Sequence, residues 1–172
     1  MKEVIVYGRG GQGAVTASQL LAISAFIDGK HSQGFPSFGV ERRGAPVTAF
    51  ARIDDKPINI RSHIYKADYA IILDPTLIKD LNIAKDLKKE AVVVVNTNNK
   101  NIKISNFKTF IFDASSLALE IFKNDIVNTI MVAAFSKFTN EISKQAVEKG
   151  LEEIFKGSVL DLNKRAVGRV FE

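Results

Sequence analysis

The sequence contains no cysteine among its 172 residues. That absence excludes disulfides, thiolate catalysis and cysteine-ligated iron–sulfur clusters on this chain. It also fits a reducing compartment, and we expect a cytoplasmic protein. The two histidines, His31 and His63, lie far apart in the sequence without cysteines or patterned carboxylates, so no metal site is predicted.

Long hydrophobic runs are also lacking. Nothing approaches the roughly 20 apolar residues of a membrane span, and Lys2 and Glu3 at the N-terminus do not fit a secretory signal. The net charge of +5 is mild, and no cluster of basic residues with aromatics is present. We therefore expect a protein that binds neither membranes nor nucleic acid.

A glycine-rich turn organises the rest of the chain. A β-branched run at residues 3–7 precedes it, and the charge-free residues 14–27 follow it as a predicted helix. Strand, turn and helix in this order begin an α/β nucleotide-binding unit. Glycines let backbone N–H groups face outward at a helix N-terminus, where partial positive charge favours an anion such as phosphate. The residues of this turn are Gly8, Arg9, Gly10, Gly11, Gln12 and Gly13.

Two expected companions of such a turn are missing. No acidic residue stands about 20 residues past the glycines to hold a ribose hydroxyl, which disfavours ordinary NAD binding. The turn also lacks the Lys-Ser/Thr ending of a loop that holds a Mg-nucleotide. Asp74 and Asp113 end predicted strands, where they either serve catalysis or cap a following helix. We predict no catalytic residue on this chain.

A second unusual stretch spans residues 37–46, with three charges, two glycines and a proline. Three interpretations stay open. It is a surface loop in which Glu41 pairs with an arginine, an anion-binding loop that uses Arg42 and Arg43, or an inter-subunit contact, where arginine is enriched.

Hydrophobic periodicity predicts an α/β fold: a Rossmann-like three-layer α/β/α arrangement with a mixed, mainly parallel sheet. A β-hairpin insertion is predicted from residues 47–53 and 58–61, with Arg52 as a solvated charge on the sheet. We expect a single domain over residues 1–172. Further strands are predicted at 69–74, 91–95 and 109–112, and helices at 77–87, 117–122, 128–138, 141–155 and 159–171, the last as a helix or an extended arm.

These motifs together resemble the gamma subunit or domain of the 2-oxoacid:ferredoxin oxidoreductases, with the pyruvate enzymes as the nearest subgroup. The resemblance rests on Gly-Arg-Gly-Gly-Gln-Gly from Gly8, and on Ser-Phe-Gly-Val-Glu-Arg-Arg-Gly-Ala-Pro-Val from Ser37 followed by Ala-Phe-x-Arg-Ile. It continues through Asp74 and around Asn128.

The resemblance implies a subunit of an enzyme that decarboxylates pyruvate oxidatively, transfers the acetyl group to coenzyme A and reduces ferredoxin. Thiamine diphosphate and [4Fe-4S] clusters would lie on partner subunits, and the partners would be alpha, beta and ferredoxin-like delta subunits, with ferredoxin reached through the complex. Coenzyme A is the ligand implied for this chain. The implied binding residues are Gly8, Arg9, Gly10, Gly11, Gln12, Gly13, Ser37, Arg42 and Arg43, with Glu41 serving either the ligand or an interface.

Two alternatives remain. One is the same role in an enzyme for 2-oxoisovalerate, 2-oxoglutarate or indolepyruvate, and the other is a stand-alone nucleotide-binding module.

Overall fold

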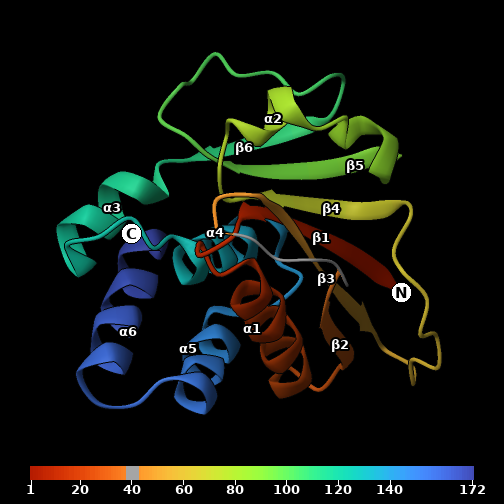
Figure 1. Cartoon of the computed structure of the whole chain (residues 1–172). Coiled ribbons are helices and arrows are strands. Elements are labelled where there is room, and N and C mark those ends of the chain that lie inside the picture. Colours follow the sequence, from red (N-terminus) through yellow and green to blue (C-terminus); the bar gives the residue numbers. More distant parts are fainter. Residues whose placement is uncertain (38–42) are drawn as a thin grey trace.

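The computed structural model describes residues 1–37 and 43–172 and is built on one six-stranded sheet in the order β2-β3-β1-β4-β5-β6. Strands β1, β4, β5 and β6 run parallel, whereas β3 pairs antiparallel with both β1 and β2. The sheet is therefore mixed and mainly parallel, as predicted (Figure 1). The strands are β1 (Lys2–Arg9), β2 (His31–Pro36), β3 (Pro46–Asp54), β4 (Ala67–Ile72), β5 (Leu87–Asn96) and β6 (Lys108–Phe112).

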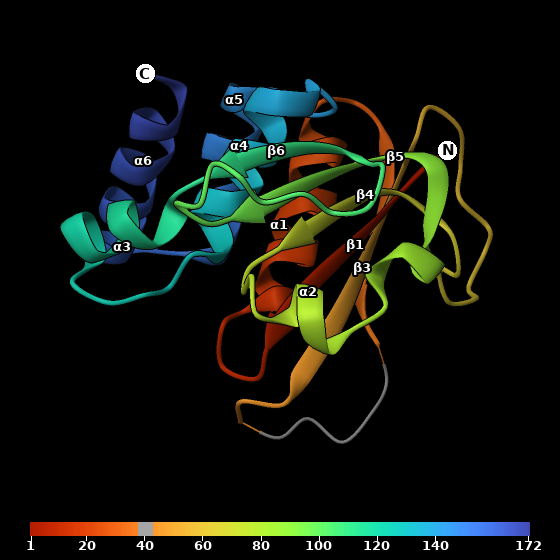
Figure 2. The same ribbon diagram turned by 90° about the horizontal axis from the view of Figure 1, so that it is seen from above.

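The helices are distributed unequally over the two faces of the sheet. One face carries the longer helices, and the other carries the short α2 and the 3-10 turn η1 together with irregular segments (Figures 1 and 2). Three layers result, the third of them thin. The helical elements are α1 (Ala14–Ile27), α2 (Leu77–Asp80), η1 (Ile83–Asp86), α3 (Ala114–Phe122), α4 (Asn128–Thr139), α5 (Lys144–Ile154) and α6 (Gly157–Phe171).

The alternation of side chains along each strand builds two separate cores. In β1, Val4 and Val6 face the long helices, whereas Ile5 and Tyr7 face the thin layer. All four are 2% exposed or less. This double burial explains why the central strands read as continuous apolar runs.

The predicted hairpin was placed wrongly. The antiparallel partners of β3 are β1 and β2, and not residues 58–61, which form no strand. Arg52 is also not solvated, because it is 1% exposed and forms an ion pair with Glu3 at 3.0 Å. Its guanidinium donates to the carbonyl oxygens of Ile60 and Ser62, at 3.4 and 2.6 Å. Arg52 thus ties the irregular segment after β3 to the sheet, and hydrogen bonds to a buried cation replace the predicted strand pairing.

Two further expectations need adjustment. The helix predicted at 77–87 is divided into α2 and η1, with an extended residue, Leu81, between them. The segment predicted at 159–171 as a helix or an extended arm is the helix α6, which spans Gly157–Phe171.

Candidate functional site

The glycine turn connects the end of β1 to the start of α1, and two of its glycines adopt backbone angles that side chains resist. Gly11 has φ +97° and Gly13 has φ +78°. An added Cβ at Gly11 would meet nothing within 4 Å, but one at Gly13 would lie 2.3 Å from Nδ2 of Asn128. Gly8 lies earlier, within the strand, where a Cβ would lie 3.2 Å from Leu73. Conformation therefore requires the glycine at position 11, and both conformation and space require the one at position 13.

Part of the turn is satisfied internally. The Gly10 N–H donates to the Ala45 carbonyl at 2.9 Å, and the Gly44 N–H donates back to the Gly10 carbonyl at 3.1 Å. Gln12 closes the turn from both sides, because its N–H donates to the Arg9 carbonyl and its side-chain oxygen accepts from the Arg9 N–H.

Two amides of the turn are left over. The N–H groups of Gly11 and Gly13 donate to no acceptor within residues 1–37 and 43–172, and both residues line a cavity. They lie at the N-terminus of α1, whose first N–H groups have no partner inside the helix. Unengaged donors at the positive end of a 14-residue helix favour an anion there.

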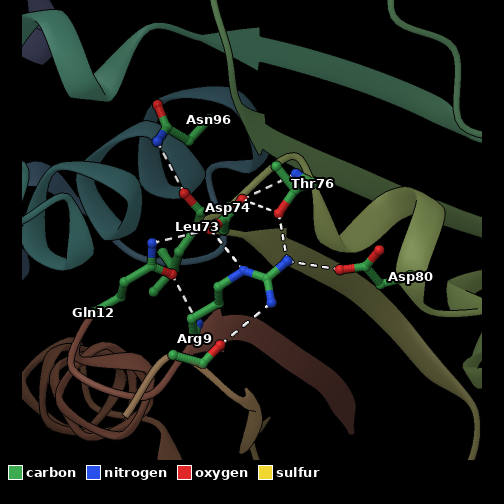
Figure 3. Close-up of polar contacts among 8 residues, drawn as sticks. Arg9, Gln12, Leu73, Asp74, Thr76, Asp80 and Asn96 are labelled. Atoms are coloured by element: carbon green, nitrogen blue, oxygen red, sulfur yellow. Dashed lines mark hydrogen bonds and ion pairs between the residues drawn. The ribbon is translucent and has the colours of Figure 1, made fainter.

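Arg9 is committed to carboxylates of its own chain (Figure 3). Its Nε lies 3.1 Å from Asp74, and one terminal nitrogen lies 2.6 Å from both Asp80 and the Thr76 hydroxyl. The other terminal nitrogen donates to the Gly44 carbonyl at 3.3 Å. This network lies at the carboxyl ends of β1 and β4, the edge of an open α/β sheet at which ligands commonly bind.

The positive charge of Arg9 and the negative charges of Asp74 and Asp80 stabilise one another. The hydrogen bond to Asp80 is the main cause that raises the pKa of Arg9 above its ordinary value, with the charges of Asp74 and Asp80 adding to it. Burial alone would raise the pKa of Asp74, but hydrogen bonds from Thr76 and Gln12 and the Arg9 charge lower it overall. Arg9 therefore shapes the turn, and its contact with a coenzyme phosphate stays a prediction.

The predicted binding residues of the stretch at 37–46 differ in their position relative to the glycine turn. Arg43 forms a parallel bridge with Gly10, which places it beside the turn; it is exposed and forms no ion pair with any described residue. Ser37 donates its N–H to Thr48 and lines a cleft on the opposite sheet face, and no described contact joins it to the turn. Glu41 and Arg42 lie outside the described residues.

Sequence reasoning missed two asparagines beside the turn. Asn96, at the end of β5, is 4% exposed; it donates to the Leu73 carbonyl at 2.9 Å and accepts from the N–H groups of Ala114 and Ser115. It thereby joins the ends of β4, β5 and α3 (Figure 3 shows the contact with Leu73). Asn128, the first residue of α4, is 7% exposed and lies against Gly13. The available signal was an asparagine at the end of an apolar strand, or at the start of a helix whose one charged residue is Lys137.

The sequence left open whether Asp113 serves catalysis or caps the following helix, and the structure shows a cap. Its carboxylate accepts from the Ser116 N–H at 3.0 Å, so it is the N-cap of α3. Within the described residues no group of three or more histidines or carboxylates could hold a metal ion, and no helix is long and apolar enough to cross a membrane.

The fold and the turn define an α/β domain built on the strand–turn–helix unit of nucleotide-binding proteins. The chain belongs to the pyruvate ferredoxin/flavodoxin oxidoreductase family, whose model matches residues 3–172.

Named relatives agree with this assignment. The chain is 49% identical over 166 residues to the pyruvate synthase subunit PorC of Methanocaldococcus jannaschii, covering 96% of this chain and 93% of that one. It is 44% identical to the common gamma subunit of the pyruvate/ketoisovalerate oxidoreductases of Pyrococcus furiosus, covering 100% of this chain and 96% of that one.

Solved structures share the fold. Pyruvate oxidoreductase subunit PORC from Thermotoga maritima superposes with a TM-score of 0.84 at 35% identity, covering 99% of this chain and 96% of that chain. The 2-oxoglutarate:ferredoxin oxidoreductase of Magnetococcus marinus, solved with coenzyme A bound, matches over 99% of this chain and 30% of its own length, with a TM-score of 0.80. At 19% identity this second likeness shows the fold alone.

Proposed function

We propose that this chain is the gamma subunit of a pyruvate:ferredoxin oxidoreductase complex, in which the glycine turn holds a phosphate of coenzyme A. The observation that carries the proposal is that the Gly11 and Gly13 N–H groups, at the N-terminus of α1, donate to no acceptor among the described residues. Coenzyme A carries a pyrophosphate and a 3′-phosphate, which such donors suit. Coenzyme A is also bound in the Magnetococcus marinus enzyme, part of which shares this fold, and this supports the choice of ligand.

The exposed Arg43 side chain, fixed beside Gly10 by the bridge, supplies the nearby positive charge in this proposal. A guanidinium pairs well with phosphate through two parallel hydrogen bonds. Arg9 acts indirectly, because its ion pairs with Asp74 and Asp80 hold the turn in shape.

The reacting centres belong to partner subunits in this proposal, namely alpha, beta and ferredoxin-like delta chains. Thiamine diphosphate supplies the decarboxylation chemistry there, and iron–sulfur clusters carry electrons to ferredoxin. The present chain has no cysteine to ligate such a cluster. The isolated chain should therefore bind coenzyme A but oxidise no 2-oxoacid.

The same subunit in a 2-oxoisovalerate enzyme is the second candidate, favoured by the Pyrococcus relative, whose name covers both pyruvate and ketoisovalerate enzymes. Purifying the tagged chain from its own cells and assaying the complex with each 2-oxoacid separates the two. A chain that purifies without any thiamine-containing partner contradicts both.

Coenzyme A binding is tested by calorimetry on the full chain with matched glycine variants. Gly11→Val should weaken binding at least tenfold, because its side chain covers the open amides. Gly29→Val is the control, since Gly29 also has a positive φ, +81°, and open space, but follows the other end of α1. Equal affinity in both variants contradicts the proposal.

Charge is tested in the same way. Arg43→Gln should weaken coenzyme A binding, with the loss shrinking at high salt, whereas Arg61→Gln, an exposed arginine after β3, should not. Similar affinities for the two variants would remove Arg43 from the site.

A further inference from the structure

A cavity of about 470 Å³ opens directly beside the glycine turn. Gly11, Gly13 and Thr16 form one wall, and side chains from the α3–α4 connection and from α6 form the others. The residues that line it include no charged side chain. The cavity therefore suits a neutral group attached to an anion held at the turn, rather than the anion itself.

Asn128 gives this cavity a polar end. Its side-chain oxygen accepts from the Thr129 N–H at 2.9 Å, which fixes the orientation of the amide. Its Nδ2 donates to no acceptor among the described residues, and it lies beside Gly13 in a residue that is 7% exposed and lines the cavity. This nitrogen is not sealed off from solvent, so it is open to donate to an acceptor that enters the cavity.

The remaining walls are mostly apolar and partly aromatic, with the polar side chains of Gln12, Asn124 and Asn163 among them. Phe122 lines the cavity from the end of α3, and Phe155 lines it from the position directly after α5. Leu162 lines it from α6. Ile126 and Val159 lie at its edge and are 45% and 50% exposed. Aromatic and aliphatic walls beside an amide donor suit a heteroaromatic base, which combines an apolar face with polar ring nitrogens.

We propose that this cavity binds the adenine ring of coenzyme A, with Asn128 Nδ2 donating to a ring nitrogen. The inference rests on the proposed function, since it assumes coenzyme A at the turn. Asparagine donates to adenine nitrogens in many complexes. The other end of coenzyme A is a thiol that must receive an acyl group, and this chain has neither a cysteine nor a thiamine motif to deliver one. The pantetheine arm therefore leaves toward the partner subunits, and the nucleotide end stays here.

Two halves of the coenzyme test the assignment by calorimetry on the full chain. Adenosine 3′,5′-bisphosphate should bind, whereas 4′-phosphopantetheine should bind at least tenfold more weakly. Asn128→Asp keeps the shape and the oxygen that accepts from Thr129, but it replaces the free donor with an acceptor. It should weaken the bisphosphate at least tenfold, because about one hydrogen bond is lost and the new carboxylate repels the phosphates. Asn101→Asp, the same change at an exposed position in the loop before β6, is the control.

A second variant guards against a folding defect at the buried asparagine. Val159→Trp, at a half-exposed position, should fill the cavity and abolish bisphosphate binding, while Val159→Ala should not. Circular dichroism checks that each variant folds. Stronger binding of 4′-phosphopantetheine, or a bisphosphate affinity that neither Asn128→Asp nor Val159→Trp changes, overturns the adenine assignment.

The outcomes separate the two proposals. Coenzyme A binding that Gly11→Val weakens, without any effect of the cavity variants, overturns only the adenine assignment. Absence of coenzyme A binding by both the full chain and the assembled complex overturns the proposed function as well.

Discussion

Adding one methyl group at Gly13 tests the geometry of the turn most directly. Gly13→Ala introduces a Cβ 2.3 Å from Asn128 Nδ2 and 3.1 Å from its Cγ, at a backbone φ of +78°. Gly11→Ala introduces the same methyl at φ +97° with nothing within 4 Å. The two variants share the backbone strain and differ in the collision.

The structure sets the size of each effect. A left-handed conformation costs an alanine about 1–2 kcal/mol, and the stiffer unfolded chain returns about 0.4–1 kcal/mol, so Gly11→Ala should lose about 1 kcal/mol. Displacing the buried Asn128 should add about 1–3 kcal/mol of overpacking, so Gly13→Ala should lose about 2–4 kcal/mol.

Urea unfolding of the full chain, followed by circular dichroism, measures both values. At roughly 2–4 °C per kcal/mol for a chain of this size, the melting temperature of Gly13→Ala should fall several degrees further than that of Gly11→Ala. Equal losses would refute the packing of Asn128 against Gly13. A stabilised Gly11→Ala would refute the left-handed turn.

Three other predictions concern the polar contacts around the sheet. Asp74→Asn should lower the free energy of unfolding by about 2 kcal/mol at neutral pH. Because the folded pKa of Asp74 is lowered, this difference should begin to shrink near about pH 4, the value for an unfolded aspartate, and vanish below the folded pKa, as an acid titration of both proteins would show. Asn96→Leu should cost about 2–4 kcal/mol in urea unfolding, since it leaves two backbone N–H groups and a carbonyl without their partner, and a loss below 1 kcal/mol would argue against those bonds. Tyr69→Phe removes a hydrogen bond to Glu141. Burial, then Glu141, raises the pKa of Tyr69, so the stability difference of about 1 kcal/mol should be present at neutral pH and shrink above about pH 10; a difference that grows with pH would contradict this sign.

The sequence predicted the parts of the fold that local pattern determines. The apolar runs of β1, β4 and β5 and the charge-free helix α1 are recognisable because burial on several faces removes polar residues. The partner of β3 was not predictable in this way. Residues 58–61 alternate as a strand does, yet the buried Arg52 side chain donates to the carbonyl oxygens of Ile60 and Ser62. These contacts join parts of the chain whose proximity arises from the fold and is not visible in the local pattern.

The candidate site divides similarly. The glycines followed from backbone geometry, which is a local property. Arg9 pairs with Asp74 and Asp80, which lie more than 60 positions away in the sequence. From the sequence alone, an arginine beside the glycines therefore suggested contact with a ligand phosphate, whereas in the fold its partners are carboxylates of the same chain. Asn128 was equally out of reach, because its position over Gly13 arises when α4 packs beside α1.

The bridge between Gly10 and Arg43 gives the turn a mechanical link to the β2–β3 connection. Both polar groups of the Gly10 backbone are shared with residues 44 and 45, so the open amides cannot change their aim without stretching those two bonds. Substitutions at Gly44 or Ala45 that weaken those two bonds should therefore change ligand affinity without contacting the ligand.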